Sequence, residues 1–236
     1  MFLQDRTGRS VRIAVIDSGV HASHPHVNGV AGGVAICEDG ALSGDFVDRL
    51  GHGTAVAAAI REKAPDAEIF AVKVFWLALA TNVAALARAF DAAAANLAQV
   101  INVSLGTSNP QHRGELAAAV ARASSAGAIV VAADEDRGVR FLPGAIDGVL
   151  PVRADWTLDR GAYAVAAIDG RTVLVTSPYP REIPGVPRER NLQGVSFAVA
   201  NASAFVARAL EAHPQADVAR VLAVLEAAQS TAESQV

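Results

Sequence analysis

Three polar residues of complementary chemistry each stand at the edge of an apolar or alanine-rich segment. Asp17 follows the apolar run at residues 11–16, His52 lies between two glycines, and Ser196 opens an alanine-rich stretch. Nucleophilic hydrolysis needs a hydroxyl, an imidazole base, and a carboxylate that orients the imidazole. Taken singly, these residues also fit an Asx turn, a helix start and an N-cap. Their combination predicts a catalytic triad.

The elements that must position these residues alternate over the first 135 residues. Strands are expected at residues 11–16, 68–75, 100–105 and 128–133, and helices at 54–63, 81–97 (capped by Thr81 or Asn82) and 115–126. Continuously apolar strands are typical of strands buried on both faces. Their alternation with helices predicts an α/β fold with a mostly parallel sheet flanked by helices.

The C-terminal part has a different pattern. Residues 163–168 and 171–176 flank Asp169 and Gly170, which favours a C-terminal β-hairpin with a type I′ turn. A proline-rich loop follows at 177–191. Helices are expected from Ser196 to about His213 and over 215–229. No repeat or linker divides the chain, so we expect one domain over residues 1–236 with a frayed tail at 230–236.

Composition narrows the partners and the location. Lys and Arg total 20 against 24 Asp and Glu, and the net charge of −4 includes no basic stripe, so no nucleic acid is expected. No apolar run is long enough to span a bilayer or to form a signal peptide, so no membrane partner is expected. The single cysteine, Cys37, has no internal disulfide partner. Together these features favour the cytoplasm and leave the oligomeric state open.

The ordered motifs resemble the subtilisin-like serine peptidase family. Six segments carry the likeness: residues 13–20 (IAVIDSGV), 24–25 (HP), 51–57 (GHGTAVA), 71–74 (AVKV), 101–106 (INVSLG) and 194–198 (GVSFA). The match runs from about residue 11 to 209. Asp, His and Ser also follow the chain order of subtilisin, unlike that of chymotrypsin or the α/β hydrolases.

The resemblance implies the subtilisin-like three-layer fold and hydrolysis of peptide bonds. Ser196 would attack the scissile carbonyl, His52 would take and return the proton, and Asp17 would orient His52. Residues Ser104, Leu105 and Gly106 would offer backbone groups to a peptide or protein substrate, which pairs like an added strand. A plain strand end at these three residues is compatible with that role.

The oxyanion position departs from the family. Where the family has Ala-Ala-Gly-Asn, this chain has Ala-Ala-Asp-Glu, which puts Glu135 in the asparagine slot, or Asp134 or Asp136 after a one-residue shift. An ionised acid would repel an oxyanion, whereas a protonated acid would donate a hydrogen bond to it. The remaining alternative is a solvent-facing acidic loop, with backbone N–H groups stabilising the oxyanion.

Two further departures concern the serine helix and metals. Ala200 replaces the proline that usually follows the serine, and alanine favours helix. His26 replaces an aspartate ligand of a structural calcium site, and calcium prefers oxygen ligands. His21, His24 and His26 form an H-x-x-H-x-H cluster without a clear fourth ligand for zinc. We expect no cofactor; calcium is conceivable but not supported.

The expected function is endoproteolysis of extended peptides through an acyl-enzyme. The first strand begins near residue 11, so no inhibitory propeptide is expected. A small enzyme without a propeptide fits a narrow range of substrates, such as a precursor or leader peptide. The proline-rich loop before Ser196 is placed to screen the cleft. Two rival functions stay open: a catalytically impaired pseudopeptidase that binds peptides, and an esterase or peptide ligase with the same triad.

Overall fold

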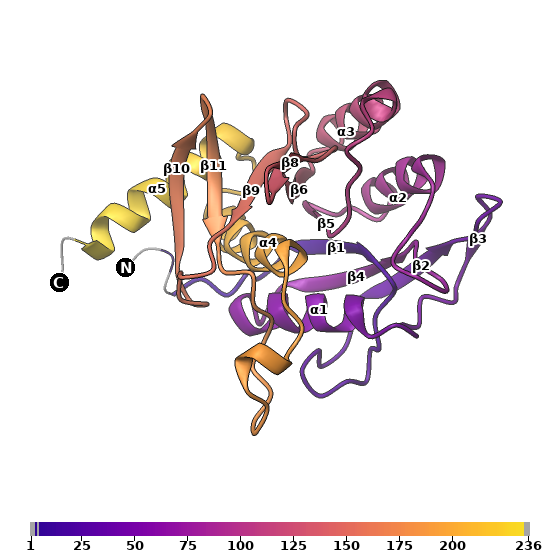
Figure 1. Cartoon of the computed structure of the whole chain (residues 1–236), viewed down its shortest axis with the longest axis horizontal. Coiled ribbons are helices and arrows are strands. Elements are labelled where there is room, and N and C mark those ends of the chain that lie inside the picture. The colour runs from indigo at the N-terminus through magenta and orange to yellow at the C-terminus, as the bar shows by residue number, and fades with distance from the viewer. Residues whose placement is uncertain (1–2, 4, 234–236) are drawn as a thin grey trace.

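The computed structural model describes residue 3 and residues 5–233 and is built around a nine-stranded sheet (Figure 1). The strands lie in the order β10-β11-β9-β6-β5-β1-β4-β2-β3. Their bounds are β1 Arg12–Asp17, β2 Gly32–Ile36, β3 Leu42–Ser43, β4 Glu68–Lys73, β5 Val100–Val103, β6 Ile129–Ala133, β9 Leu150–Ala154, β10 Tyr163–Ile168 and β11 Arg171–Thr176. Pairing is parallel from β2 to β11, and only the edge strands β3 and β10 pair antiparallel. The predicted mostly parallel sheet is confirmed.

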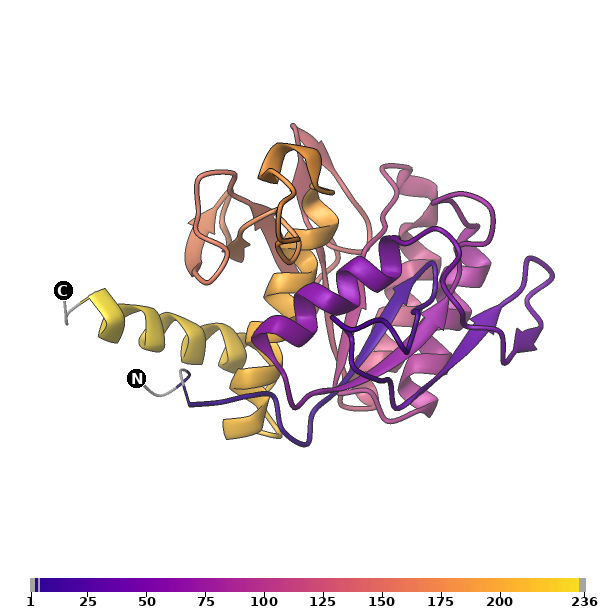
Figure 2. The same cartoon turned by 90° about the horizontal axis from the view of Figure 1, so that it is seen from below.

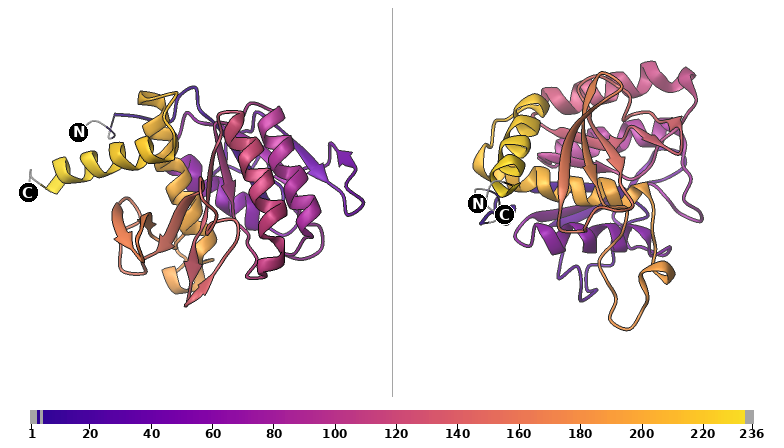
Figure 3. Two further views of the ribbon diagram at one scale, coloured as in Figure 1. Left: turned by 90° about the horizontal axis from the view of Figure 1, so that it is seen from above. Right: turned by 60° about the vertical axis from the view of Figure 1, so that its left-hand side comes forward.

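Helices cover both faces of this sheet (Figures 2 and 3). One face carries α1 (His52–Lys63), α4 (Val195–Ala212) and α5 (Val218–Glu233); the other carries α2 (Val83–Ala95) and α3 (Arg113–Ser125). Short 3-10 turns occupy Pro110–His112 and Arg188–Arg190. Alternate residues of β1 enter different cores: Ile13 and Val15 pack in the first, Ala14 and Ile16 in the second. Burial on both faces is the reason these strands read as unbroken apolar runs.

Most helix ends agree with the sequence-based expectations. Asn82, rather than Thr81, caps α2 by accepting a hydrogen bond from the Ala85 N–H at 2.7 Å. The last helix begins at Val218, later than expected, and its backbone continues to Glu233. The first part of the tail expected at residues 230–236 thus continues the helix, whereas residues 234–236 lie outside the described residues.

The hairpin is confirmed, and five strands were not expected. Asp169 and Gly170 have φ of 51° and 74°, the pair of positive values that a type I′ turn requires. The strands β2, β3, β9 and the small pair β7 (Glu135–Asp136) and β8 (Val139–Arg140) carry no clear sequence signal. Pro151 argues against a strand, yet it lies in the part of β9 that pairs with β6 and outside the part that pairs with β11.

The strand order places the functional residues together. From β1 the chain moves to β4 on one side, and then crosses through α2 to β5 on the other side of β1. In open α/β sheets, such a reversal of strand order leaves a crevice outside the carboxyl ends of the strands. Asp17 ends β1, Ser104 follows β5, and His52 begins α1. The crevice is therefore where the predicted site residues meet.

Candidate active site

Asp17 and His52 form a buried pair at the end of β1. The Nδ1 atom of His52 lies 2.8 Å from Oδ1 and 2.9 Å from Oδ2 of Asp17, and the Asp17 side chain is fully buried. Gly53 makes this approach possible, because a Cβ at this position would lie 2.1 Å from the Gly19 carbonyl oxygen. The glycine beside His52 therefore lets the start of α1 pack directly against the aspartate turn.

The environment of His52 favours an imidazole that can accept and hold a proton. Burial lowers the pKa of His52, but the hydrogen bond and charge of Asp17, with a contribution from Asp48, raise it above its ordinary value overall. Because Asp17 contacts Nδ1, the other ring nitrogen, Nε2, is left for proton transfer. The imidazole packs against Phe197, with ring centroids 5.5 Å apart.

Ser196 lies in the first turn of α4, near the same crevice. Its Oγ donates a hydrogen bond to the Ser104 carbonyl oxygen at 3.1 Å. Within the part of the chain that the structure describes, Ser196 makes no hydrogen bond to His52. A Ser196 hydroxyl that passed its proton to the imidazole would first have to turn away from this carbonyl.

The segment Ser104 to Gly106 follows β5 and has one edge already paired. Thr107 and Leu142 exchange two backbone hydrogen bonds, of 3.0 and 2.8 Å. A Cβ on Gly106 would lie 2.9 Å from the Leu142 carbonyl oxygen, so the close approach of these two segments requires glycine. Any peptide that adds to residues 104–106 as a strand must use the opposite edge. Ser104 is buried and Leu105 half-buried, whereas Gly106 is exposed.

Two of the acids at the end of β6, Asp134 and Glu135, are engaged by arginines. Asp134 is 1% exposed and accepts hydrogen bonds from Arg153 Nε at 2.9 Å and from Arg171 Nη1 at 2.5 Å. Glu135 lies 3.1 Å from Arg153 Nη2. A carboxylate held between guanidinium groups acts as an acceptor in an ion pair, not as a hydrogen-bond donor. Asp134 is also buried, so the expected solvent-facing loop is wrong for this residue.

The backbone N–H of Ser196 can donate a hydrogen bond to an oxyanion, a role that the two paired acids do not fill. Ser196 stands in the first turn of α4, where N–H groups lack intrahelical acceptors. Among the described residues, none accepts a hydrogen bond from the Ser196 N–H. The positive end of the helix dipole adds to this N–H, and both favour negative charge beside the serine.

Asp48 is a site residue that motif matching missed. Its buried carboxylate accepts five hydrogen bonds: Oδ1 from Ser18 Oγ, Leu50 N and Gly51 N, each at 2.9 Å, and Oδ2 from Thr54 N at 2.9 Å and Thr54 Oγ1 at 2.6 Å. Despite burial, these hydrogen bonds lower the pKa of Asp48. The carboxylate thus ties the residue after Asp17 to the residues on both sides of His52. An aspartate four residues before the histidine was the available sequence signal.

The proline-rich segment at residues 178–193, here called the hook, extends beside the start of α1 and the loop containing His24 and His26 (Figure 1). Asn201 of α4 fixes the N-terminal end of the hook by donating to the Ser177 and Tyr179 carbonyl oxygens at 2.8 and 3.2 Å. The Gly194 N–H donates to the Pro178 carbonyl at 2.9 Å. With alanine at position 200, α4 continues without a break.

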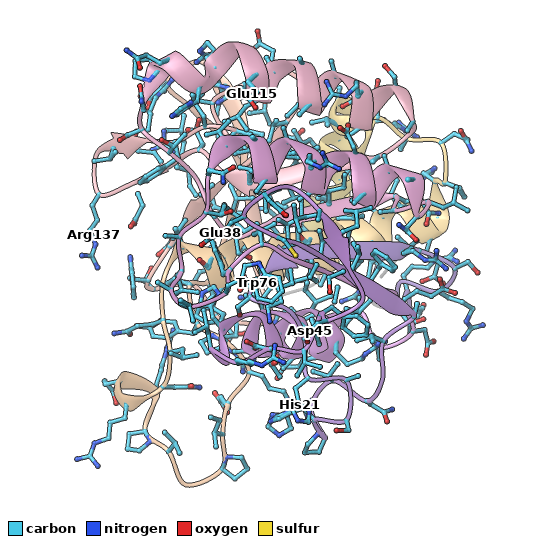
Figure 4. All side chains as sticks on the ribbon, turned by 90° about the vertical axis from the view of Figure 1, so that its right-hand side faces the viewer. His21, Glu38, Asp45, Trp76, Glu115 and Arg137 are labelled. Atoms are coloured by element: carbon cyan, nitrogen blue, oxygen red, sulfur yellow. The ribbon has the colours of Figure 1, made fainter. Side chains whose placement is uncertain are left out.

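The described contacts of the histidine cluster link His24 with His26 and His21 with Ser23. His24 and His26 contact each other edge to face with ring centroids 5.2 Å apart, and His21 Nδ1 lies 3.2 Å from Ser23 Oγ. Figure 4 shows His21 on the side of α1 from which the hook extends. Over residues 3 and 5–233, no three His, Cys, Asp or Glu side chains come together in a way that would hold a metal ion. In the same range, no helix is long and apolar enough to cross a membrane.

Comparisons with known proteins agree with this geometry. The sequence profile of the Subtilase family matches residues 8–235. A thermostable alkaline protease of Halalkalibacterium halodurans is 30% identical over 224 residues, which cover 88% of this chain and 58% of that protein. This chain thus spans little more than half of that relative.

Solved structures show the same fold. A cold-adapted subtilisin-like serine proteinase superposes with a TM-score of 0.72 at 20% identity, over 94% of this chain and 83% of that one. A lanthipeptide protease superposes with a TM-score of 0.68 at 21% identity, over 93% and 80%. The family profile covers nearly the whole chain, and the subtilisin-like fold carries an Asp-His pair with a serine helix beside it. The chain therefore belongs to the subtilase family.

Proposed function

We propose that this protein is a serine endopeptidase in which Ser196 is the nucleophile, His52 the general base and Asp17 the orienting acid. The observation that carries the proposal is the buried Asp17–His52 pair, which leaves Nε2 of the imidazole unengaged by Asp17, with Phe197, the neighbour of Ser196, packed against the ring. A paired imidazole of raised pKa beside a helix-start serine is the arrangement that acyl transfer needs.

The proposed reaction proceeds in two halves. The Ser196 hydroxyl proton passes to His52 Nε2 while Oγ bonds to the scissile carbonyl carbon, and the resulting oxyanion lies beside the Ser196 N–H. His52 then protonates the leaving amine, the C–N bond breaks, and an acyl-enzyme remains. Water enters, gives its proton to His52, and releases the acid and the Ser196 hydroxyl. Asp17 stays ionised throughout and stabilises the imidazolium.

We further propose a narrow substrate range, such as a precursor or leader peptide. Two features of the cleft support it. The hook extends from the residues just before Ser196, and Phe141 packs against Gly106, with its Cβ 3.0 Å from where a Gly106 Cβ would lie. Both would limit the room for a substrate that pairs with residues 104–106 or reaches the hook. One solved relative is described as a lanthipeptide protease, but its identity of 21% extends only the fold to this chain.

The test combines an activity-based probe with peptide cleavage. A fluorophosphonate should label the wild type and the Ser203→Ala control, whose change removes a buried hydroxyl elsewhere in α4, but not Ser196→Ala. A peptide library should be cleaved by the same two proteins. His52→Ala and Ser196→Ala should be non-additive, because the two residues act as one unit.

The same assay separates the rival functions. Peptide binding without labelling or cleavage would identify a pseudopeptidase, for which the turn of Ser196 towards Ser104 is the supporting observation. Labelling with rapid turnover of an acyl ester, but none of the matching amide, would identify an esterase. Equal cleavage by the wild type and Ser196→Ala would contradict the proposed mechanism.

A further inference from the structure

A pocket of about 410 Å³ lies between the hook and the start of α1. Gly51, Thr54, Ala55 and Ala58 form its α1 side, so the pocket begins at the residue next to His52. The segment at residues 104–107, in contrast, turns towards Leu142 after β6. An extended peptide that pairs with residues 104–106 and crosses Ser196 would meet this hook pocket with its other flank.

The ionisable side chains that line the hook pocket are arginines and histidines. Arg181, Arg190, His24 and His26 lie on its walls, and no aspartate or glutamate does. The Arg181 side chain donates one hydrogen bond, from Nη1 to the His26 carbonyl at 3.4 Å, and the Arg190 side chain has no ion-pair partner among the described residues. Burial, Arg181 and His24 all lower the pKa of His26, against a smaller opposing effect of Glu62. The two arginines are the permanently charged groups of the pocket.

Two acids in or close to the hook in the structure, Glu62 and Glu182, lie near other cations. Glu62 is paired with Lys63 and Arg160, and Glu182 is 81% exposed and lies 3.8 Å from Arg160. Three N–H groups at the start of α1 are also occupied, because Gly53 donates to Ser18 Oγ, Thr54 donates to Asp48 and Ala55 donates to the Gly51 carbonyl. An anion in this pocket would thus be held by the guanidinium groups and not by the helix terminus.

The hook pocket also has apolar walls and a fixed frame. Ile183, Val186 and Leu192 contribute exposed apolar side chains, and Ala55 and Ala58 lie opposite them on α1. Asn191 Nδ2 donates to the Arg181 carbonyl at 3.1 Å, which ties the two limbs of the hook together and holds Arg181 at the pocket. Apolar walls beneath a guanidinium pair match the methylene stem and carboxylate of an acidic side chain.

We propose that the hook pocket is a specificity site that binds an acidic side chain of the peptide substrate, on the flank that does not pair with residues 104–106. Arg181 and Arg190 receive the carboxylate, and the apolar walls receive the rest of the side chain. This inference rests on the proposed peptidase function for its biological meaning, but the binding it describes is measurable without turnover.

The test measures binding to Ser196→Ala protein, which keeps peptides intact. Short fluorescein-labelled peptides differ only in having Glu, Gln or Lys at one position, which is moved stepwise along the sequence. At one position we expect Glu to bind about fivefold more tightly than Gln, and Lys more weakly, as for a partly exposed ion pair. The preference should weaken at high salt, because exposed charges are screened.

The variants assign the preference to the pocket. Arg181→Gln with Arg190→Gln should remove the advantage of Glu, and Arg190→Glu should reverse it towards Lys. Arg220→Gln, which removes the same charge from the exposed face of the distant α5, should leave it unchanged. A Glu preference absent at every position, or kept by the double variant, would overturn the inference. Because binding is the readout, a loss of turnover alone would count against the peptidase function and not against the pocket.

Discussion

Asp48 offers the sharpest test of how this site is built. Asp48→Asn keeps the shape of the side chain but replaces one acceptor oxygen with an NH₂ donor. If the remaining oxygen takes the Oδ1 position, the bonds from Ser18, Leu50 and Gly51 survive. The Thr54 N–H then faces a second donor, while the Thr54 hydroxyl can turn to become an acceptor. One buried backbone donor is thus left unsatisfied.

The structure sets the size of the effect. An unsatisfied buried donor costs about 1–3 kcal/mol, and loss of the ionised acceptor weakens the surviving hydrogen bonds. We expect the free energy of unfolding to fall by about 2–4 kcal/mol, which lowers Tm by roughly 10 °C for a chain of this size. Asp48→Ala removes all five acceptor contacts and should cost more.

The pH dependence of activity separates a role at the site from a purely structural one. The charge of Asp48 contributes to the raised pKa of His52, together with that of Asp17. His52 must be neutral to act as base, so activity rises as pH increases through its pKa. Removing the Asp48 charge lowers the pKa of His52 and should move the rising limb of kcat/KM to lower pH. Three other charged residues lie near Asp48 and are unchanged in the variant: Lys73, Asp45 and Arg49. The Lys73 Nζ donates to the Val47 carbonyl, and Asp45 pairs with Arg49.

The control is Asp45→Asn, which removes the same charge from the same loop. Asp45 contacts Arg49 at 2.9 Å on the surface and accepts none of the five hydrogen bonds of Asp48. It should change Tm and the pH profile little. The measurements are thermal unfolding by circular dichroism and kcat/KM against pH. If Asp48→Asn matches Asp45→Asn in both, the carboxylate does not organise the site.

Three further predictions concern the ion pairs and metals. Asp134→Asn should lower the free energy of unfolding by about 3 kcal/mol, because it breaks a buried ion pair with Arg153 and Arg171; an unchanged Tm would contradict this. Glu135→Gln should change kcat/KM by less than about twofold, roughly 0.4 kcal/mol, because Glu135 is paired with Arg153. The dependence of kcat/KM on alkaline pH should be the same in this variant as in the wild type. Melting curves recorded with chelator and with millimolar calcium should coincide; a rise of several degrees with calcium would reveal a site that His26 does not exclude.

The sequence alone determined the features that depend on local residues. The apolar runs predicted the parallel strands, since strands buried on both faces must be apolar throughout. Asp17, His52 and Ser196 were recognisable because each lies in a short motif at the end of a strand or the start of a helix. Their likeness in one chain order predicted the subtilase family, which the comparisons confirmed.

Only the tertiary structure decided what depends on residues distant in the chain. Whether the acids after β6 are donors, solvent-facing or paired could not be read locally, because the partners of Asp134 lie 19 and 37 residues further on. Asp48 looks like an ordinary loop residue until the fold brings Ser18, 30 residues away, to its carboxylate. The hook pocket likewise exists only because residues 178–193 pack beside α1. Burial and charge pairing are properties of the assembled surroundings, so the motifs predict the proposed catalytic residues while the fold sets their environment.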